Sequence, residues 1–242
     1  MKAVSTLRFR TVFRLPVVLG LFAATSAYAT DATWLQNPVD SLWSNPNNWA
    51  PNTVPNATTD TATFGASDTT TIDIISPISV ASVTFTAGAS PYALTVSNNQ
   101  SMTLAGSPSV INNSGIEQDF VPAGGVFYFN GAQTFDSTIH FSVLGGNNTR
   151  TGGTVWFQSG ISTGTASIDI EGSDGFFAPG NVVYFLGNAG SSTIYLHRGI
   201  GKGIGGRLTF ESAGAGLGQY HCGGQRQGGQ EWRECGLLEW RR

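Results

Sequence analysis

The sequence predicts an all-β protein folded as a right-handed parallel β-helix, a solenoid with coils of about 25–28 residues; an antiparallel β-sandwich is the alternative. Three observations lead to this prediction. Only 11% of the 242 residues are charged, against roughly 25% in ordinary soluble domains, and Gly, Ser, Thr and Asn take their place. Short stretches alternate apolar and polar residues, and no helical periodicity follows residue 29. The second half of the chain repeats.

The repeat unit consists of a strand, a Gly-rich turn and a second strand. Units open on "GGVFYF", "GGTVWF", "GNVVYF" and "GGRLTF". We expect their aromatic residues, spaced by 28, 28 and 25 residues, to form an inward ladder: Phe129, Phe157, Phe185 and Phe210. Three isoleucines mark the second strands: Ile139, Ile168 and Ile194. Because one unit cannot bury its apolar face alone, the units must stack.

Residues 1–29 have the pattern of a secretory signal peptide. A basic leader precedes a short apolar run at residues 15–24, and Ala27-Tyr28-Ala29 forms a small-x-small cleavage site. The apolar run is too short to span a bilayer, and no later segment reaches spanning length. We therefore expect a secreted or cell-surface protein, cleaved after Ala29, with no membrane-spanning segment.

The charge of the region that follows argues against nucleic acid as a partner. Residues 30–218 contain four basic and twelve acidic side chains. Phosphate binding requires clustered Lys and Arg, which this balance does not provide.

Residues 30–59 form a Trp-rich segment that we expect to cap the N-terminal end of the solenoid. Asn-Pro and Pro-Asn pairs interrupt regular structure around Trp34, Trp43 and Trp49. A capping segment would cover the core that the first coil otherwise exposes. The alternative is a sugar-binding site, in which Trp43 and Trp49 stack on sugar rings and Asn48 supplies hydrogen bonds.

Residues 60–218 contain the predicted solenoid repeats, beginning with "DTATF", "TTIDI", "SVASVTF", "YALTV" and "SMTLAG". Together with "WSNPNNWAPNTVPNATTDTATF" and the "GGTVWF" units, this region resembles exported bacterial proteins with autotransporter-associated β-strand repeats. The resemblance implies a passenger-type β-solenoid that commonly ends in an outer-membrane β-barrel or a sorting anchor. Neither end module is found in this sequence, so the mode of attachment stays open.

Residues 219–242 differ in composition and contain both cysteines of the chain. If the codons after Gly218 are read one base later, they can encode "NITAEGSVKAGKSGGSVVFLNGG", which would continue the repeat. We therefore predict an aberrant, frameshifted and disordered tail. A disulfide between Cys222 and Cys235 is an alternative, whereas a zinc site with His221 lacks the usual paired spacing.

Three acidic residues lie close together in "IDIEGSDG": Asp169, Glu171 and Asp174. Paired carboxylates can act as acid and base in glycoside cleavage, so a polysaccharide lyase or hydrolase is one hypothesis. His140 and His197 occupy comparable strands and could be neighbours. The segment "GIGKGIGG" lacks the Ser or Thr of a phosphate-binding loop and is expected to be a flexible corner.

The favoured hypothesis is an exported structural or adhesive solenoid, a truncated passenger fragment with no catalysis, cofactor or metal. Its partners would be cell-surface glycans or other copies of the chain, meeting at solenoid edges. A third possibility is a degraded gene product without function.

Overall fold

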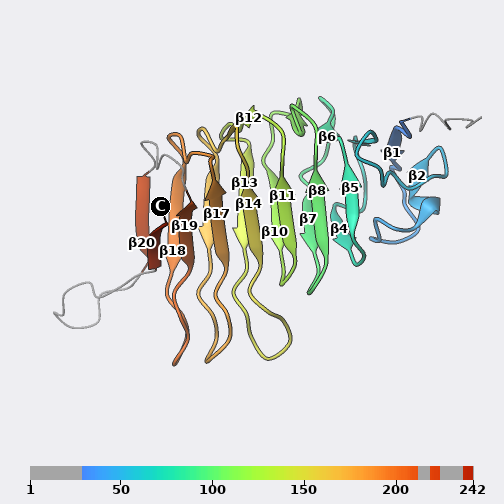
Figure 1. Cartoon of the computed structure of the whole chain (residues 1–242). Helices are drawn as coiled ribbons and strands as arrows, with labels where there is room; N and C mark the ends of the chain where they lie inside the picture. Colours follow the sequence, from blue (N-terminus) through green and yellow to red (C-terminus); the bar gives the residue numbers. More distant parts are fainter. Residues whose placement is uncertain (1–28, 212–218, 224–236, 242) are drawn as a thin grey trace, which may run out of the picture.

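Strands from successive turns of the chain lie parallel and in register on one another, forming a β-solenoid of about seven turns (Figure 1). The computed structural model describes residues 29–211, 219–223 and 237–241. The predicted signal peptide lies outside this range except for Ala29. All strand pairs are parallel except β1 with β2, which is antiparallel. The solenoid prediction is confirmed, and the antiparallel sandwich is excluded.

Three sheets form the sides of the solenoid. Sheet I contains β4 (Thr71–Ile74), β7 (Ala93–Val96), β10 (Gln118–Pro122), β13 (Ile139–Val143), β16 (Ser167–Ile170), β18 (Thr193–His197) and β20 (Gln219–Gly223). Sheet II contains β5 (Ile78–Val80), β8 (Ser101–Leu104), β11 (Val126–Phe129), β14 (Thr154–Phe157), β17 (Asn181–Phe185), β19 (Arg207–Glu211) and β21 (Leu237–Arg241).

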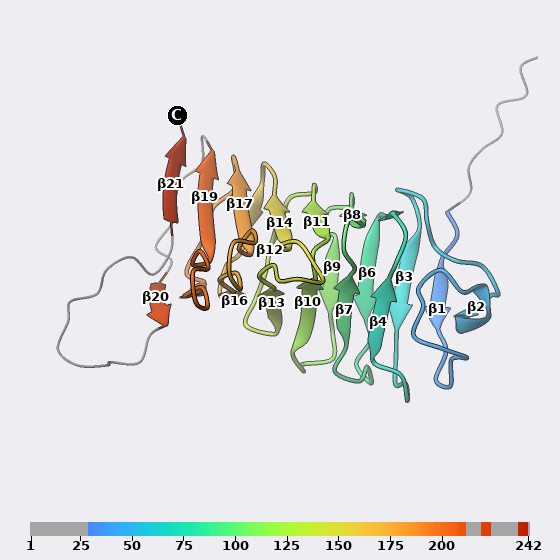
Figure 2. The same ribbon diagram turned by 90° about the horizontal axis from the view of Figure 1, so that it is seen from below.

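Sheet III covers only the N-terminal half of the stack (Figure 2). It contains β2 (Trp49–Ala50), β1 (Ala32–Trp34), β3 (Thr61–Phe64), β6 (Ser82–Phe85) and β9 (Val110–Asn112), with a 3-10 turn, η1 (Pro46–Asn48), before β2. Beyond it, β12 (Gln133–Thr134) pairs with β15 (Ile161–Ser162). Where sheet III ends at β9 and the β12–β15 pair begins, Gln133 Oε1 accepts hydrogen bonds from the Ser109 and Val110 amides at 2.8 and 2.9 Å.

The core is a column of stacked aromatic rings, but its members differ from the prediction at one position. Phe129 and Phe157 stack with their ring centroids 5.5 Å apart, and Tyr184 follows at 5.0 Å from Phe157 and 5.0 Å from Phe210. Phe185 is 42% exposed and points away from the core. The strand after Gly180 has one residue more before its Phe than the equivalent unit, so register places Tyr184 inside.

The three isoleucines that mark the predicted second strands lie in β13, β16 and β18 of sheet I. Ile168 lies beside Phe141 on one side and Ile194 on the other. Ile139 is buried, but it pairs with Gln118 instead. Phe141, Ile168 and Ile194 form the column, because Ile139 lies two residues before Phe141, the residue that faces Ile168.

The last two described strands continue sheets I and II. β20 pairs with β18 and β21 with β19, both in parallel. These ten residues of the predicted aberrant tail therefore lie in strands, and its other residues lie outside the described ranges. In the register of β20, Tyr220 stands opposite Ile194, the position at which the alternative reading frame would place an isoleucine. Cys235 lies outside the described residues, as does any pairing it makes.

Three long loops project together from the edge between sheets I and II, at the bottom of Figure 1. This loop stack comprises residues 144–153, 171–180 and 198–206. Backbone hydrogen bonds join neighbouring loops: the Gly146 amide donates to the Ala178 carbonyl at 2.7 Å, and the Gly175 amide donates to the Ile200 carbonyl at 3.1 Å. A Cβ atom at Gly203 would lie 1.9 Å from the Ser173 carbonyl oxygen, so this close approach requires glycine. The "GIGKGIGG" segment is part of this hydrogen-bonded stack.

Replacing Phe157 by Ala should destabilise the solenoid by about 3–5 kcal/mol, because it opens a cavity in the aromatic column. Phe185→Ala is the matched control, since the side chain is exposed; its effect should be within about 0.5 kcal/mol. Urea unfolding followed by circular dichroism measures both. Equal losses in the two variants would contradict the assignment of the column.

Candidate functional site

Four ionisable side chains form a ladder on the outward face of sheet I. They come from four consecutive strands: Asp119 of β10, His140 of β13, Asp169 of β16 and His197 of β18. In each strand these positions alternate with buried apolar ones, so the side chains share the outer face. The register sets Asp119 directly beside His140, whereas His140 and Asp169 are diagonal neighbours.

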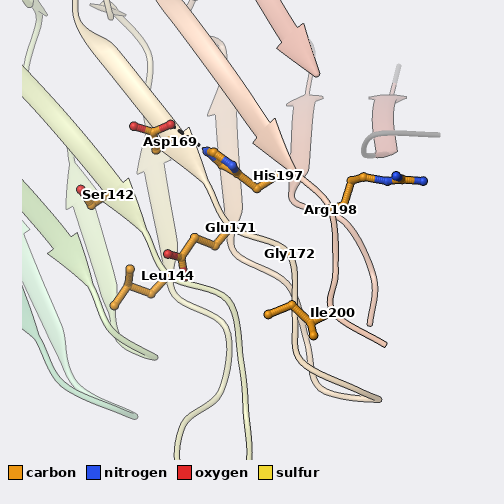
Figure 3. A pocket seen from close by; sticks show the side chains of 8 residues that line it. All are labelled: Ser142, Leu144, Asp169, Glu171, Gly172, His197, Arg198 and Ile200. Atoms are coloured by element: carbon orange, nitrogen blue, oxygen red, sulfur yellow. Dashed lines mark hydrogen bonds and ion pairs between the residues drawn. The ribbon is translucent and has the colours of Figure 1, made fainter. Parts of the chain in front are cut away.

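Asp169 bridges the two histidines. Its Oδ2 lies 2.9 Å from His140 Nε2, and its Oδ1 lies 2.8 Å from His197 Nε2 (Figure 3 shows the contact with His197). On the other side, His140 Nδ1 is 3.4 Å from Asp119 Oδ1, and the Ser142 hydroxyl donates to Asp119 Oδ2 at 2.9 Å. The ladder therefore connects four coils through side chains as well as through the backbone.

The electrostatics favour a charged His140. Its hydrogen bond to Asp169 raises the pKa of His140, with burial opposing and the charge of Asp119 adding to the increase. The same hydrogen bond lowers the pKa of Asp169. Burial raises the pKa of Asp119, whose Oδ1 has no hydrogen-bond partner among the described residues. His140 thus lies between two carboxyl groups, and its contact with Asp169 favours the protonated ring.

This arrangement is poorly suited to nucleophilic catalysis. Ser142 Oγ lies 3.4 Å from His140 Nδ1, which superficially resembles a nucleophile and its base. The Ser142 hydroxyl donates to Asp119 Oδ2, however, so its proton is directed away from the imidazole. The ladder is better suited to holding adjacent coils together.

A shallow groove of about 490 Å³ lies beside the ladder, and Figure 3 shows its lining. The lining residues are Ser142, Leu144, Asp169, Glu171, Gly172, His197, Arg198 and Ile200. Among the predicted acidic residues, Asp169 and Glu171 therefore share one groove. Asp174 does not line it, because it lies exposed in the second loop of the stack.

Both groove carboxylates are already engaged. Asp169 binds two histidines, and Glu171 Oε2 lies 3.6 Å from an Arg150 guanidinium nitrogen and accepts a hydrogen bond from the Gly145 amide at 3.2 Å. Arg150 in turn donates to the Gly145 carbonyl at 2.8 Å. Glu171 therefore fixes the base of the first long loop. Among the described residues, no group of three or more His, Cys, Asp or Glu could hold a metal ion.

Sequence reasoning suggested that His140 and His197 could be neighbours but missed Asp119 and Ser142. The histidines do not touch directly; Asp169, from the coil between them, joins them. One feature of the sequence could have indicated this contact. Asp169 in "SIDI" and His140 in "TIHF" occupy similar places in comparable strands, and in the structure they are two residues apart in register.

The alternative sugar-binding residues Trp43, Asn48 and Trp49 are buried, with exposures of 0%, 0% and 2%. The two indole rings pack edge to face with centroids 4.9 Å apart. The Trp43 indole donates to the Pro55 carbonyl, and the Trp49 indole donates to the Trp43 carbonyl. Their rings offer no free face on which a sugar could stack.

Asn48 organises the loop around these tryptophans. Its side-chain oxygen accepts a hydrogen bond from the Val39 amide at 2.8 Å. Its amide nitrogen donates to Asp40 Oδ1 at 2.7 Å and to the Leu42 carbonyl at 2.8 Å. Hydrogen bonds from Asn48, the Leu42 amide and Asn45 lower the pKa of Asp40. All polar groups of Asn48 thus serve the segment itself.

Within the described part of the chain, no helix has the length and apolar character needed to cross a membrane. No family model, no curated protein and no solved structure matches the chain. The resemblance to autotransporter-associated repeats therefore depends on the sequence motifs alone.

Trp43→Ala should remove about 3–5 kcal/mol of folding free energy, because the buried indole packs against Trp49 and Phe64. Thermal unfolding by circular dichroism measures the loss. Exposed Val39→Ala, in the same segment, is the control and should change stability little. A Trp43→Ala protein with an unchanged melting temperature would contradict the capping role.

His140→Gln should lower stability by about 1 kcal/mol in mildly acidic solution, with the difference shrinking as pH rises. Folding raises the pKa of His140, so its contribution is fully present below the ordinary value of 6.5 and is lost as pH passes through the raised pKa. The facing groups are Asp169, Asp119 and Glu117. Urea unfolding over a pH series measures this difference.

An independent readout is the His140 titration followed by NMR. Asp169→Asn should lower the His140 pKa, because it removes the hydrogen-bonded carboxylate that stabilises the charged ring. An unchanged titration in Asp169→Asn, or a pH-independent effect of His140→Gln, would contradict the charged ladder.

Proposed function

We propose that this chain is an exported, surface-associated β-solenoid that serves as a spacer or adhesive stalk, a passenger-type fragment of an autotransporter-like protein. The observation that carries the proposal is the continuous in-register stack, in which two sheets extend through seven strands each. A stack of this kind gains length with each coil and displays a repeated lateral surface. The signal-peptide pattern of residues 1–29 and the motif resemblance support export.

The contacts of the polar face support a structural role. Asp169, His140 and Asp119 bind one another across coils, and Glu171 holds the first long loop through Arg150 and the Gly145 amide. The contacts that these side chains make therefore join parts of the solenoid to one another. Cell-surface glycans or further copies of the chain are the proposed partners, through weak contacts repeated along the stack.

Export is tested by producing the whole chain in a Gram-negative bacterium. We expect the exported protein to begin at Thr30 on N-terminal sequencing, because cleavage should follow Ala29. A variant with Arg at positions 27 and 29 should keep its leader. Adhesion is then measured as binding of the purified mature chain to a glycan array and to immobilised copies of itself. Accumulation of the uncleaved chain in the cytoplasm would refute export.

The second candidate is a polysaccharide-active enzyme, favoured by the shared groove of Asp169 and Glu171. A lyase or hydrolase of this kind would release reducing ends from pectin or alginate. Because both carboxylates are already held by neighbouring side chains, we expect no release of reducing ends from either polysaccharide. Product formation that disappears in Asp169→Asn and Glu171→Gln would instead establish the enzyme.

A further inference from the structure

The tips of the loop stack expose large apolar side chains. Phe176 is 85% exposed, Ile200 68%, Ile204 56% and Phe177 43%. They lie in two adjacent loops, which Asp174 and Ile200 join as a parallel bridge. Most large apolar residues that the structure describes are buried in the core, so four exposed ones on neighbouring loops indicate an interaction surface.

Positive charge is concentrated at the same place. The four Lys and Arg residues between residues 29 and 211 are Arg150, Arg198, Lys202 and Arg207, and the first three lie in the loop stack. The loops carry only two of the twelve acidic residues, Glu171 and Asp174. Lys202 Nζ lies 5.5 Å from the centre of the exposed Phe176 ring. A cationic, apolar edge thus stands on an acidic body.

The loops present these side chains on an ordered frame. The Gly175 and Ile200 amides hydrogen-bond across to the neighbouring loop, and the Ser173 amide donates to the Ile204 carbonyl at 2.8 Å. Gly175 and Gly201 adopt left-handed φ angles at the turns, and a Cβ atom at either position would meet no neighbouring atom. The tips therefore face open space, and they extend beyond the shorter corners of the earlier coils (Figure 1).

We propose that the loop stack docks on an anionic lipid surface. Phe176 and Ile200 would enter the interfacial region, while Lys202 and Arg198 contact the acidic headgroups; Arg150 stays paired with Glu171 at the base of the first loop. Phe and Ile have no hydrogen-bonding groups, whereas a sugar site needs such groups beside its aromatic rings. The acidic remainder of the body would be repelled by the same surface, which fixes the edge that approaches. This inference rests on the proposed function: it specifies the surface with which the exported chain associates.

Vesicle sedimentation of the purified chain tests this proposal. We expect binding to phosphatidylcholine vesicles containing about a third phosphatidylglycerol, weaker binding to pure phosphatidylcholine, and release by added salt. Phe176→Ser should weaken binding about tenfold, and Phe176→Leu should retain it. Phe185→Ser is the matched control, because this exposed Phe lies at the opposite end of β17; it should bind as the native chain does.

Lys202→Glu should weaken binding to the anionic vesicles by more than about fivefold, whereas Lys202→Arg should retain it. Circular dichroism checks that each variant folds. The proposal is overturned by absent vesicle binding, by equal binding to neutral vesicles, or by equal losses in Phe176→Ser and Phe185→Ser. It is also overturned if Phe176→Ser abolishes dimerisation or glycan binding but leaves vesicle binding intact. Glycan-array or self-adhesion signals that persist without vesicle binding would leave the proposed function standing.

Discussion

In-register parallel hydrogen bonding between successive coils is the constraint on which the whole molecule depends. Each strand takes its partners from the coil before it, so a residue is fixed beside its counterpart at the roughly 4.8 Å strand spacing. Inside, this puts Phe129, Phe157, Tyr184 and Phe210 into one column. Outside, the same rule brings carboxyl groups and imidazoles from four coils within hydrogen-bonding reach. The core and the polar ladder are therefore two results of one pairing pattern.

The solenoid and much of its core could be predicted, because the apolar alternation and the units that begin with Gly can be recognised in the sequence. The prediction of the core failed at one unit, where the number of residues between the turn glycine and the following Phe differs from that of its neighbour. Spacing alone selected Phe185, but the strand is aligned from Gly180, and alignment from the glycine puts Tyr184 inside. A difference of one residue reverses the face of a strand, which makes such errors abrupt.

The candidate site was harder to predict than the core. The histidines were recognisable as members of comparable strands, yet their link is Asp169, and its reach to both depends on diagonal register and side-chain direction. Two glutamines are similar: Gln118 is buried and Gln133 is partly buried. Gln118 and Gln133 look like ordinary surface residues in the sequence, but their amide oxygens cap backbone groups inside the stack. Polar contacts of this kind leave no periodic signal.

The backbone bonds between the long loops connect two scales of the molecule. Since each loop leaves the stack at the same edge, every coil built with such a loop adds another copy of the contact at a constant interval. Weak individual contacts on a rigid array combine multiplicatively once the first has formed, as long as the target is broad enough to meet them all. The number of coils would then determine avidity as well as length. Duplication or deletion of one repeat unit would change the avidity while leaving the sequence of each loop unchanged.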